Sequence, residues 1–181
     1  MRVVAGKYGG RRILAPKGRS TRPTADRVRE SLFSRLGDLE GCSVLDLFAG
    51  SGSLGLEALS RGAKSAVFID QAATAITALK ANINSLKLGD RCQVIKGAAK
   101  VELQRFQAAG VSFHLVFLDP PYGAELSLDA LVGVRPLLEV GGEAILESSA
   151  AEDLVKVPGF KILDERSYGQ TRITRYNAEP G

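Results

Sequence analysis

The chain has 181 residues, of which 45% are hydrophobic, so it is long enough for one domain with a sizeable core. It contains no run near the ~20 apolar residues of a membrane span and no apolar stretch typical of a signal peptide. One His and two Cys, at no metal-binding spacing, argue against a metal site. We therefore expect a cytoplasmic protein without a membrane partner, in which Cys42 and Cys92 are buried free thiols.

The positive charge lies at the N-terminal end. Residues 1–36 contain ten Lys or Arg against two acidic residues (+8), and the remaining chain has 14 basic against 18 acidic residues (−4). A basic block beside a nearly neutral body is typical of a protein that grips a polyanion, although a merely solvated basic face is the simpler alternative. The asymmetry favours nucleic acid, and the candidate phosphate-binding residues are Arg2, Lys7, Arg11, Arg12, Arg19 and Arg22.

Two short strands are predicted at the start of the chain. Arg2–Ala5 and Arg11–Leu14 flank a glycine-rich stretch and are typical of a β-hairpin. A polar loop follows, and then apolar residues at a spacing of four predict a helix over 24–36. We therefore expect a single domain, 1–181, with a basic hairpin and loop extension at residues 1–23.

Strands and helices alternate in the rest of the chain. Apolar runs predict strands at 43–48, 65–70, 92–96, 113–119 and 143–148. Helical periodicity between them predicts helices at 54–61, 71–88, 99–108 and 126–138. This alternation indicates an α/β protein with a parallel sheet and right-handed crossovers. Two last strands, at 159–165 and 170–176, have no clear helix between them and predict a hairpin at one sheet edge.

A glycine-rich turn follows the strand at 43–48. The segment 44–55 reads VLDLFAGSGSLG, and Gly50, Gly52 and Gly55 match the dinucleotide fingerprint G-x-G-x-x-G. Asp46, however, lies at the strand end, where its charge would repel a pyrophosphate. It suits a cationic ligand with an amino-acid head, such as S-adenosylmethionine. A strand-end cap is the alternative role for this residue.

The next predicted strand ends in Asp70, twenty residues after Gly50. An acid at that position can accept hydrogen bonds from both ribose hydroxyls of a nucleoside cofactor. A helix N-cap is the alternative role. Two acids at these spacings together favour a cofactor site.

The tetrapeptide Asp119-Pro120-Pro121-Tyr122 follows the apolar run 115–118, at the carboxyl end of a predicted strand, where open α/β sheets bind ligands. The Asp119 carboxylate can accept one N–H of a planar amine, and a backbone carbonyl of the stiff proline pair can accept the other. The Tyr122 ring offers a surface on which a nucleobase can stack. A turn that caps a helix is the alternative. If the strand order reverses after the strand at 43–48, cofactor and base meet in one crevice.

These segments resemble the RsmD-type 16S ribosomal RNA guanine-N2 methyltransferases. The specific part is the leading segment, above all RPTADRVRESLF at Arg22–Phe33, whereas LDLFAGSG and DPPY occur across many amino-methyltransferases. The resemblance implies a Rossmann-like fold of seven strands in the order 3-2-1-4-5-7-6, with S-adenosylmethionine as donor. It also implies that the acceptor is one guanine of 16S rRNA, usually guanine 966, in an assembled or assembling small ribosomal subunit. We expect the protein itself to be a monomer.

The resemblance also implies roles for individual residues. The cofactor positions are Asp46, Phe48, Ala49, Gly50, Ser51, Gly52 and Asp70, and the acceptor positions are Asp119, Pro120, Pro121 and Tyr122. The chain departs from many related enzymes after the strand at 92–96, because 95–99 (IKGAA) contains no acid for the adenine amino group. If adenine binds there, backbone groups of Gly97 or Ala98 must make the contact.

Three other functions are compatible with parts of this pattern. A DNA adenine-N6 or cytosine-N4 methyltransferase would share the Asp119 loop, although the chain leaves no room for an obvious DNA-recognition domain. A nicotinamide-dependent dehydrogenase would use the glycines but leaves Asp46 and Asp119 unexplained. A non-catalytic RNA-binding assembly factor would need neither acid.

Overall fold

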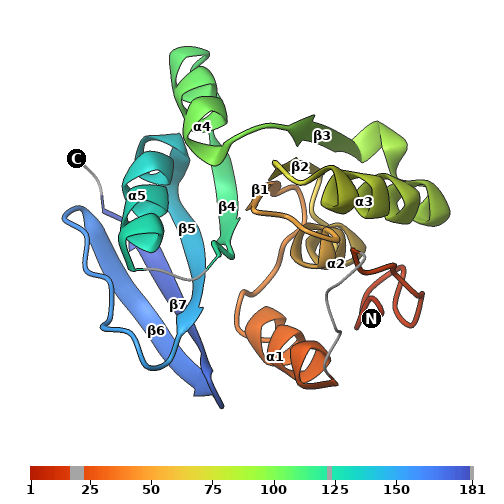
Figure 1. Cartoon of the computed structure of the whole chain (residues 1–181), viewed down its shortest axis with the longest axis horizontal. Coiled ribbons are helices and arrows are strands. Elements are labelled where there is room, and N and C mark those ends of the chain that lie inside the picture. The colour runs from red at the N-terminus through yellow and green to blue at the C-terminus, as the bar shows by residue number, and fades with distance from the viewer. Residues whose placement is uncertain (17–22, 122–123, 180–181) are drawn as a thin grey trace.

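A seven-stranded sheet in the order β3-β2-β1-β4-β5-β7-β6 forms the middle of the protein (Figure 1). The computed structural model describes residues 1–16, 23–121 and 124–179. The strands are β1 (Ser43–Leu47), β2 (Ser65–Asp70), β3 (Cys92–Lys96), β4 (Phe113–Leu118), β5 (Leu138–Ser149), β6 (Phe160–Tyr168) and β7 (Thr171–Ala178). The helices are α1 (Pro23–Phe33), α2 (Ser53–Ser60), α3 (Ala73–Leu86), α4 (Ala99–Ala108) and α5 (Ala124–Val134), with short 3₁₀ turns at Gly89–Arg91 and Arg135–Leu137. The predicted fold class and strand order are confirmed.

The sheet is parallel from β3 to β5, and the pairs β5–β7 and β7–β6 are antiparallel. The predicted hairpin at one sheet edge is therefore confirmed. The helix predicted at 126–138 instead ends at Val134, because Pro136 disfavours a helical conformation at Arg135 and the chain tightens into a 3₁₀ turn. The strand expected at 143–148 is longer, since β5 already begins at Leu138.

Side chains of successive strand residues face opposite layers. In β4, Leu115 and Phe117 join the core under α1, α2 and α3, whereas Val116 and Leu118 join the core under α4 and α5. Figure 1 shows these two groups of helices on opposite sides of the sheet. The same alternation places Asp46 on the α2 side, because Val44, two residues earlier, packs there.

The leading segment packs against α2, and its two ends pair over a shorter stretch than expected. One antiparallel bridge joins Arg2 to Arg12, and the backbone N–H groups of Val3, Gly10 and Ile13 donate across the pair to the carbonyls of Arg11, Val3 and Met1. The backbone N–H groups of Val4 and Ala5 donate instead to the Glu57 carboxylate of α2, so the ladder does not extend to them. The predicted antiparallel pairing is therefore confirmed, but it stops short of the regular strands expected at 2–5 and 11–14.

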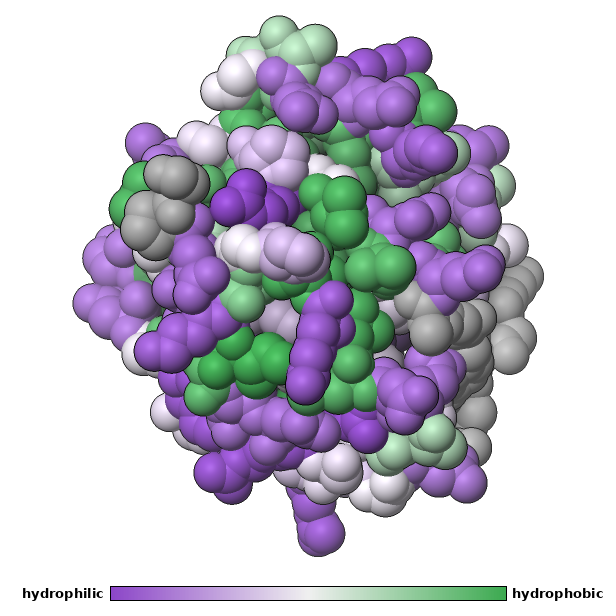
Figure 2. Space-filling model, turned by 90° about the vertical axis from the view of Figure 1, so that its left-hand side faces the viewer, coloured by the Kyte–Doolittle hydropathy of each residue, from purple (hydrophilic) through white to green (hydrophobic). Residues whose placement is uncertain are grey.

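The side of the molecule that carries α5 and the β5–β7–β6 edge shows apolar patches interrupted by charged side chains (Figure 2). The large exposed apolar residues of these elements include Leu126, Leu128, Val132, Val140 and Leu163. None of the described helices has the length and apolar character that a membrane crossing requires. Cys42 and Cys92 are free, as expected, but half-buried instead of buried.

Candidate active site at the carboxyl ends of β1, β2 and β4

The strand order reverses at β1, which pairs with β2 on one side and with β4 on the other. Leu47, the last residue of β1, is in register with Leu118, the last residue of β4. The turn after β1 and the loop that begins at Asp119 therefore start side by side, as the sequence predicted. Such a reversal leaves a crevice at the carboxyl ends of the strands.

The glycine-rich turn has a backbone that few residues other than glycine adopt. Phe48, Gly50 and Gly52 have positive φ angles of 67°, 56° and 78°. A Cβ on Gly52 would lie 2.4 Å from the Leu79 side chain of α3, so glycine at this positive φ lets the start of α2 pack against α3. Phe48, which is not a glycine, holds the unfavourable left-handed conformation at the site itself.

The third glycine of the motif has a different purpose. A Cβ on Gly55 would lie 2.4 Å from the ring of Phe68, so glycine lets α2 pack against β2. The backbone N–H of Gly55 then donates to Asp46 Oδ2 at 2.9 Å. The glycines of this motif therefore allow the close packing of α2, and one of them fixes the Asp46 carboxyl beneath the turn.

Asp46 is a buried carboxyl, with only 3% of its surface exposed. Its pKa is raised to about 8, first of all by burial and also by the nearby charges of Asp119 and Asp70, whereas the Gly55 N–H acts to lower it. Among the described residues no Lys or Arg forms an ion pair with it. A further negative charge in this site would therefore be unfavourable, whereas a bound cation would be stabilised by the ionised carboxylate.

Asp70 ends β2 at the edge of the crevice. Its Oδ2 accepts the N–H of Gly50 and its Oδ1 accepts the N–H of Ala72, each at 2.8 Å. These two bonds fix the carboxylate plane beside the glycine-rich turn. Because a carboxylate oxygen has more than one lone-pair site, each oxygen can still accept a hydroxyl.

A cavity of about 540 Å³ lies at this end of the sheet. Of the predicted residues, Phe48, Gly50, Asp70, Gly97, Ala98, Asp119 and Pro121 line it. Asp46, Ala49, Ser51, Gly52 and the buried Pro120 lie outside its lining, and Tyr122 lies outside the described residues. The lining also contains residues that the sequence did not predict: Pro16, Ile69, Gln71, Ala72, Thr74, Ala75, Ala99, Lys100 and Leu126. Those next to Asp70 and Gly97 could have been predicted from their adjacency to these two residues in the sequence, but nothing in the sequence around Pro16 places it near the cavity.

The segment after β3 confirms that no acid follows the strand directly. Gly97 donates its N–H to the Asp70 carbonyl at 3.1 Å, which holds this loop against the end of β2. A Cβ on Gly97 would lie 2.6 Å from Oε1 of Glu102, a buried residue of α4. A side chain at this position would displace the Glu102 carboxylate, so glycine lets that carboxylate stay buried against the loop.

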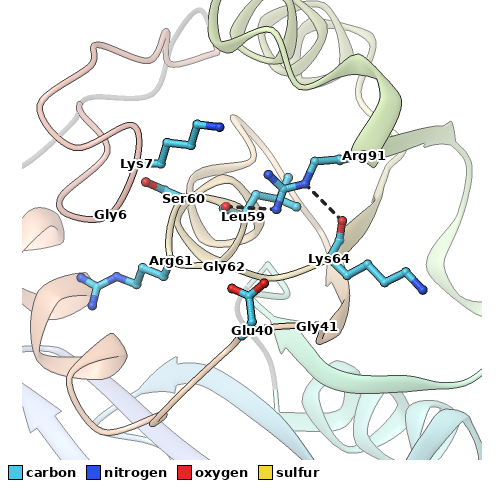
Figure 3. A pocket seen from close by; sticks show the side chains of 10 residues that line it. All are labelled: Gly6, Lys7, Glu40, Gly41, Leu59, Ser60, Arg61, Gly62, Lys64 and Arg91. Atoms are coloured by element: carbon cyan, nitrogen blue, oxygen red, sulfur yellow. Dashed lines mark hydrogen bonds between the residues drawn. The ribbon is translucent and has the colours of Figure 1, made fainter.

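A second cavity, of about 790 Å³, lies at the opposite, amino end of β1 and β2 (Figure 3). Basic residues surround it, but Figure 3 shows Arg61 and Lys64 pointing away from its centre. The guanidinium of Arg91 is bonded to the carbonyls of Leu59, Ala63 and Lys64. Because the charges do not converge, this cavity is not a candidate anion site.

The predicted RNA-binding residues differ in what surrounds them. Arg2, Lys7, Arg11 and Arg12 are exposed on the leading segment, and Arg19 and Arg22 lie outside the described residues. The charged groups of Lys7 and Arg11 lie 5.8 and 5.7 Å from the Tyr8 ring centre. The Nε of Arg2 lies 3.8 Å from a carboxylate oxygen of Asp26.

Other arginines of the basic block have an internal role. Arg29 is 4% exposed and bonds Asp26 and the Arg2 carbonyl. Arg35, two residues after the end of α1, pairs with Asp164 and so holds this turn against β6. Part of the N-terminal charge therefore holds the fold together and is not available to a polyanion.

Comparison with known proteins gives a consistent result over the whole chain. A family model described as conserved hypothetical protein 95 matches residues 1–177. The ribosomal RNA small subunit methyltransferase D of Escherichia coli K12 is 35% identical over 187 aligned residues, which cover 99% of this chain and 90% of the relative. The protein of the same name from Haemophilus influenzae is 32% identical, over 93% and 89%.

A solved structure agrees. The Escherichia coli protein yhhF superposes with a TM-score of 0.89 at 33% identity, over 100% of this chain and 99% of that one. The described residues contain no group of three or more His, Cys, Asp or Glu placed to hold a metal ion. The chain therefore belongs to the conserved hypothetical protein 95 family, the RsmD-type family whose motifs its sequence resembles.

Proposed function

We propose that this chain transfers a methyl group from S-adenosylmethionine to the exocyclic N2 amine of a guanine in 16S rRNA. The observation that carries the proposal is the register of β1 and β4, which brings the glycine-rich turn and the Asp119 loop to one cavity. The methyltransferase names of relatives that span the chain support the same reaction class.

The donor set fits S-adenosylmethionine, which supplies a methyl group on a positively charged sulfur. Asp46, Asp70 and Asp119 are close enough for the charges of the latter two to raise the pKa of Asp46. A pyrophosphate placed among these acids would oppose ionisation of Asp46 further, whereas a cationic cofactor favours its ionised form. Asp70, fixed by two backbone N–H groups, would accept the ribose hydroxyls, and the Gly97 and Ala98 backbone would meet the adenine ring.

The acceptor side would be formed by the loop after β4. Asp119 lines the cavity and would accept one N–H of the guanine amine, and the Pro120 carbonyl would accept the other. Both contacts favour a pyramidal nitrogen, whose lone pair is otherwise delocalised into the ring. Alignment of this amine with the methyl group would supply most of the acceleration, and water can take the proton of the product.

The target base must leave its stack to enter such a cavity, at a cost of a few kcal/mol. Tyr122 would offer a stacking surface for the flipped base. The exposed Arg2, Lys7, Arg11 and Arg12 would recover part of the cost through phosphate contacts. In this proposal the substrate is rRNA in the assembled or assembling small subunit.

The test is methylation in vitro, followed by identification of the modified base. Small subunits and naked 16S rRNA from cells that lack the gene would be incubated with the protein and labelled S-adenosylmethionine. We expect N2-methylguanosine at one position in one of the two substrates and no label in DNA. Label in adenine N6 or cytosine N4, or none with either RNA, would contradict the proposal. Asp119→Ala is the control for adventitious activity.

A further inference from the structure

The leading segment crosses the glycine-rich turn, so the two predicted binding regions are in contact. The hydroxyl of Ser51, within the turn, lies 3.7 Å from the sulfur of Met1. Val3 and Ile13 are buried in the core under α2, at 1% and 4% exposure. Farther along the segment, Pro16 lines the cofactor cavity.

One buried side chain joins the segment to the turn. Asn82 on α3 is 2% exposed. Its Oδ1 accepts the N–H of Leu14 at 2.7 Å, and its Nδ2 donates to the carbonyls of Leu14 at 3.0 Å and Ser51 at 2.9 Å. An Asn amide has two N–H donors and one carbonyl acceptor, and here all three functions are used.

The geometry demands an amide of this length. Aspartate would keep the acceptor for the Leu14 N–H but lose both donors, and alanine would lose all three bonds. The Leu14 side chain is itself 61% exposed, so the segment is held here by its backbone and not by burial of this side chain. The three hydrogen bonds of Asn82 therefore fix the path of the chain between exposed Arg12 and cavity-lining Pro16.

We propose that Asn82 is a positioning residue that couples RNA binding on the leading segment to cofactor binding at the glycine-rich turn. The inference rests on the proposed function. RNA bound by Arg11 and Arg12 would hold the leading segment in place. Through the hydrogen bonds of Asn82, this would also fix the position of the Ser51 carbonyl and of Pro16 in the cavity lining. Because coupling is reciprocal, bound cofactor must strengthen RNA binding by the same factor.

The test measures the coupling directly. Calorimetry would give the dissociation constant of S-adenosylhomocysteine with and without saturating 16S rRNA transcribed in vitro. For the unmodified protein we expect RNA to tighten cofactor binding about fivefold or more, the lower end of typical coupling. In Asn82→Ala and Asn82→Asp the factor should fall to one, and the affinity without RNA should fall roughly tenfold.

The matched control is Asn84→Ala, a change of the same residue type on the same helix at an exposed position, which should behave as the unmodified protein. Hydrogen exchange at the Leu14 amide would show whether Asn82→Asp releases the segment in folded protein. Asn82 variants that lose thermal stability but keep the coupling factor would overturn the proposal, and so would an unmodified protein without coupling. If the unmodified protein binds no S-adenosylhomocysteine, the proposed function itself fails.

Discussion

Two buried carboxylates, eleven positions apart, differ in how their charge is compensated. Glu57 has no exposed surface, and it accepts the backbone N–H groups of Val4 and Ala5 and pairs with Arg61 at 2.7 Å and Arg29 at 3.8 Å. Asp46 is almost as buried but accepts one backbone N–H, from Gly55, and faces two other acids. A buried acid that is paired with arginines and backbone N–H groups holds segments together. A buried acid without such partners indicates a site that binds a cation.

Loss of the compensated acid should have the largest effect. Glu57→Ala leaves two backbone N–H groups without an acceptor, at about 1–3 kcal/mol each, and removes one of the two carboxylates beside buried Arg29, so we expect a destabilisation of about 2–6 kcal/mol. Urea unfolding followed by circular dichroism measures it. Asp46→Asn, which keeps an acceptor for Gly55, is the matched comparison and should be neutral or stabilising. Equal losses for both variants would remove the distinction.

Asp119, the acid in the acceptor loop, should affect the rate of methyl transfer and not the affinity for the cofactor. Asp119→Ala removes the proposed contact to the amine, so single-turnover methyl transfer should fall about 100-fold or more. Binding of S-adenosylhomocysteine should change little, because that contact is to the acceptor. A folded variant with near-normal transfer would show that the residue only shapes its loop.

Ionisation of Asp46 should make the stability of the protein depend on pH. Because its pKa in the folded protein is about 8, above its ordinary value near 4, the folded state holds more protons between these two values. The free energy of unfolding should therefore decrease as pH rises from about 4 to about 8 and level off above. Asp46→Asn should lose this dependence.

Binding of the cationic cofactor should show the opposite trend, since it requires the ionised carboxylate. S-adenosylmethionine should bind more tightly as pH approaches 8, with release of about one proton at lower pH. Calorimetry in buffers of different ionisation enthalpy measures this release, which should disappear in Asp46→Asn. Proton release that persists in this variant would assign it to another group.

Charge on the leading segment should have the smallest effect per residue. Removing residues 1–16 would also remove buried Val3 and Ile13 and would leave Glu57 without its backbone donors, so truncation mixes folding with binding. The sharper change is the triple variant of Lys7, Arg11 and Arg12 to alanine. The log–log salt slope of RNA binding should fall by roughly 0.7–0.9 per lost phosphate contact.

The control variant removes the same charge from three exposed lysines elsewhere, Lys87, Lys156 and Lys161. It should leave the slope unchanged. A slope that drops equally in both triple variants would indicate general attraction and no defined RNA surface on the leading segment.

The sequence by itself determined the α/β layers and the residues at the strand ends, and its resemblance to a known family supplied the strand order. The layers and the strand-end residues depend on local patterns: apolar runs of strand length, glycine in the turn after β1, and acids at the carboxyl ends of β1, β2 and β4. Such signals lie within one segment, so no distant contact is needed to recognise them. The meeting of the Asp119 loop with the glycine-rich turn followed from topology and is confirmed by the register of Leu47 with Leu118.

Only the tertiary structure decided which charges are internal and what the leading segment does. Nothing near Arg29 in sequence distinguishes it from exposed Arg11, because burial depends on the helix packed against it, and Glu57 lies 28 positions away. The expected hairpin is shortened to a single bridge because the next backbone donors, of Val4, Ala5 and Tyr8, found side-chain acceptors on α2. Likewise Asn82 reads as an ordinary helical residue, and its role arises from contacts with backbone 31 and 68 positions away, which local periodicity does not encode.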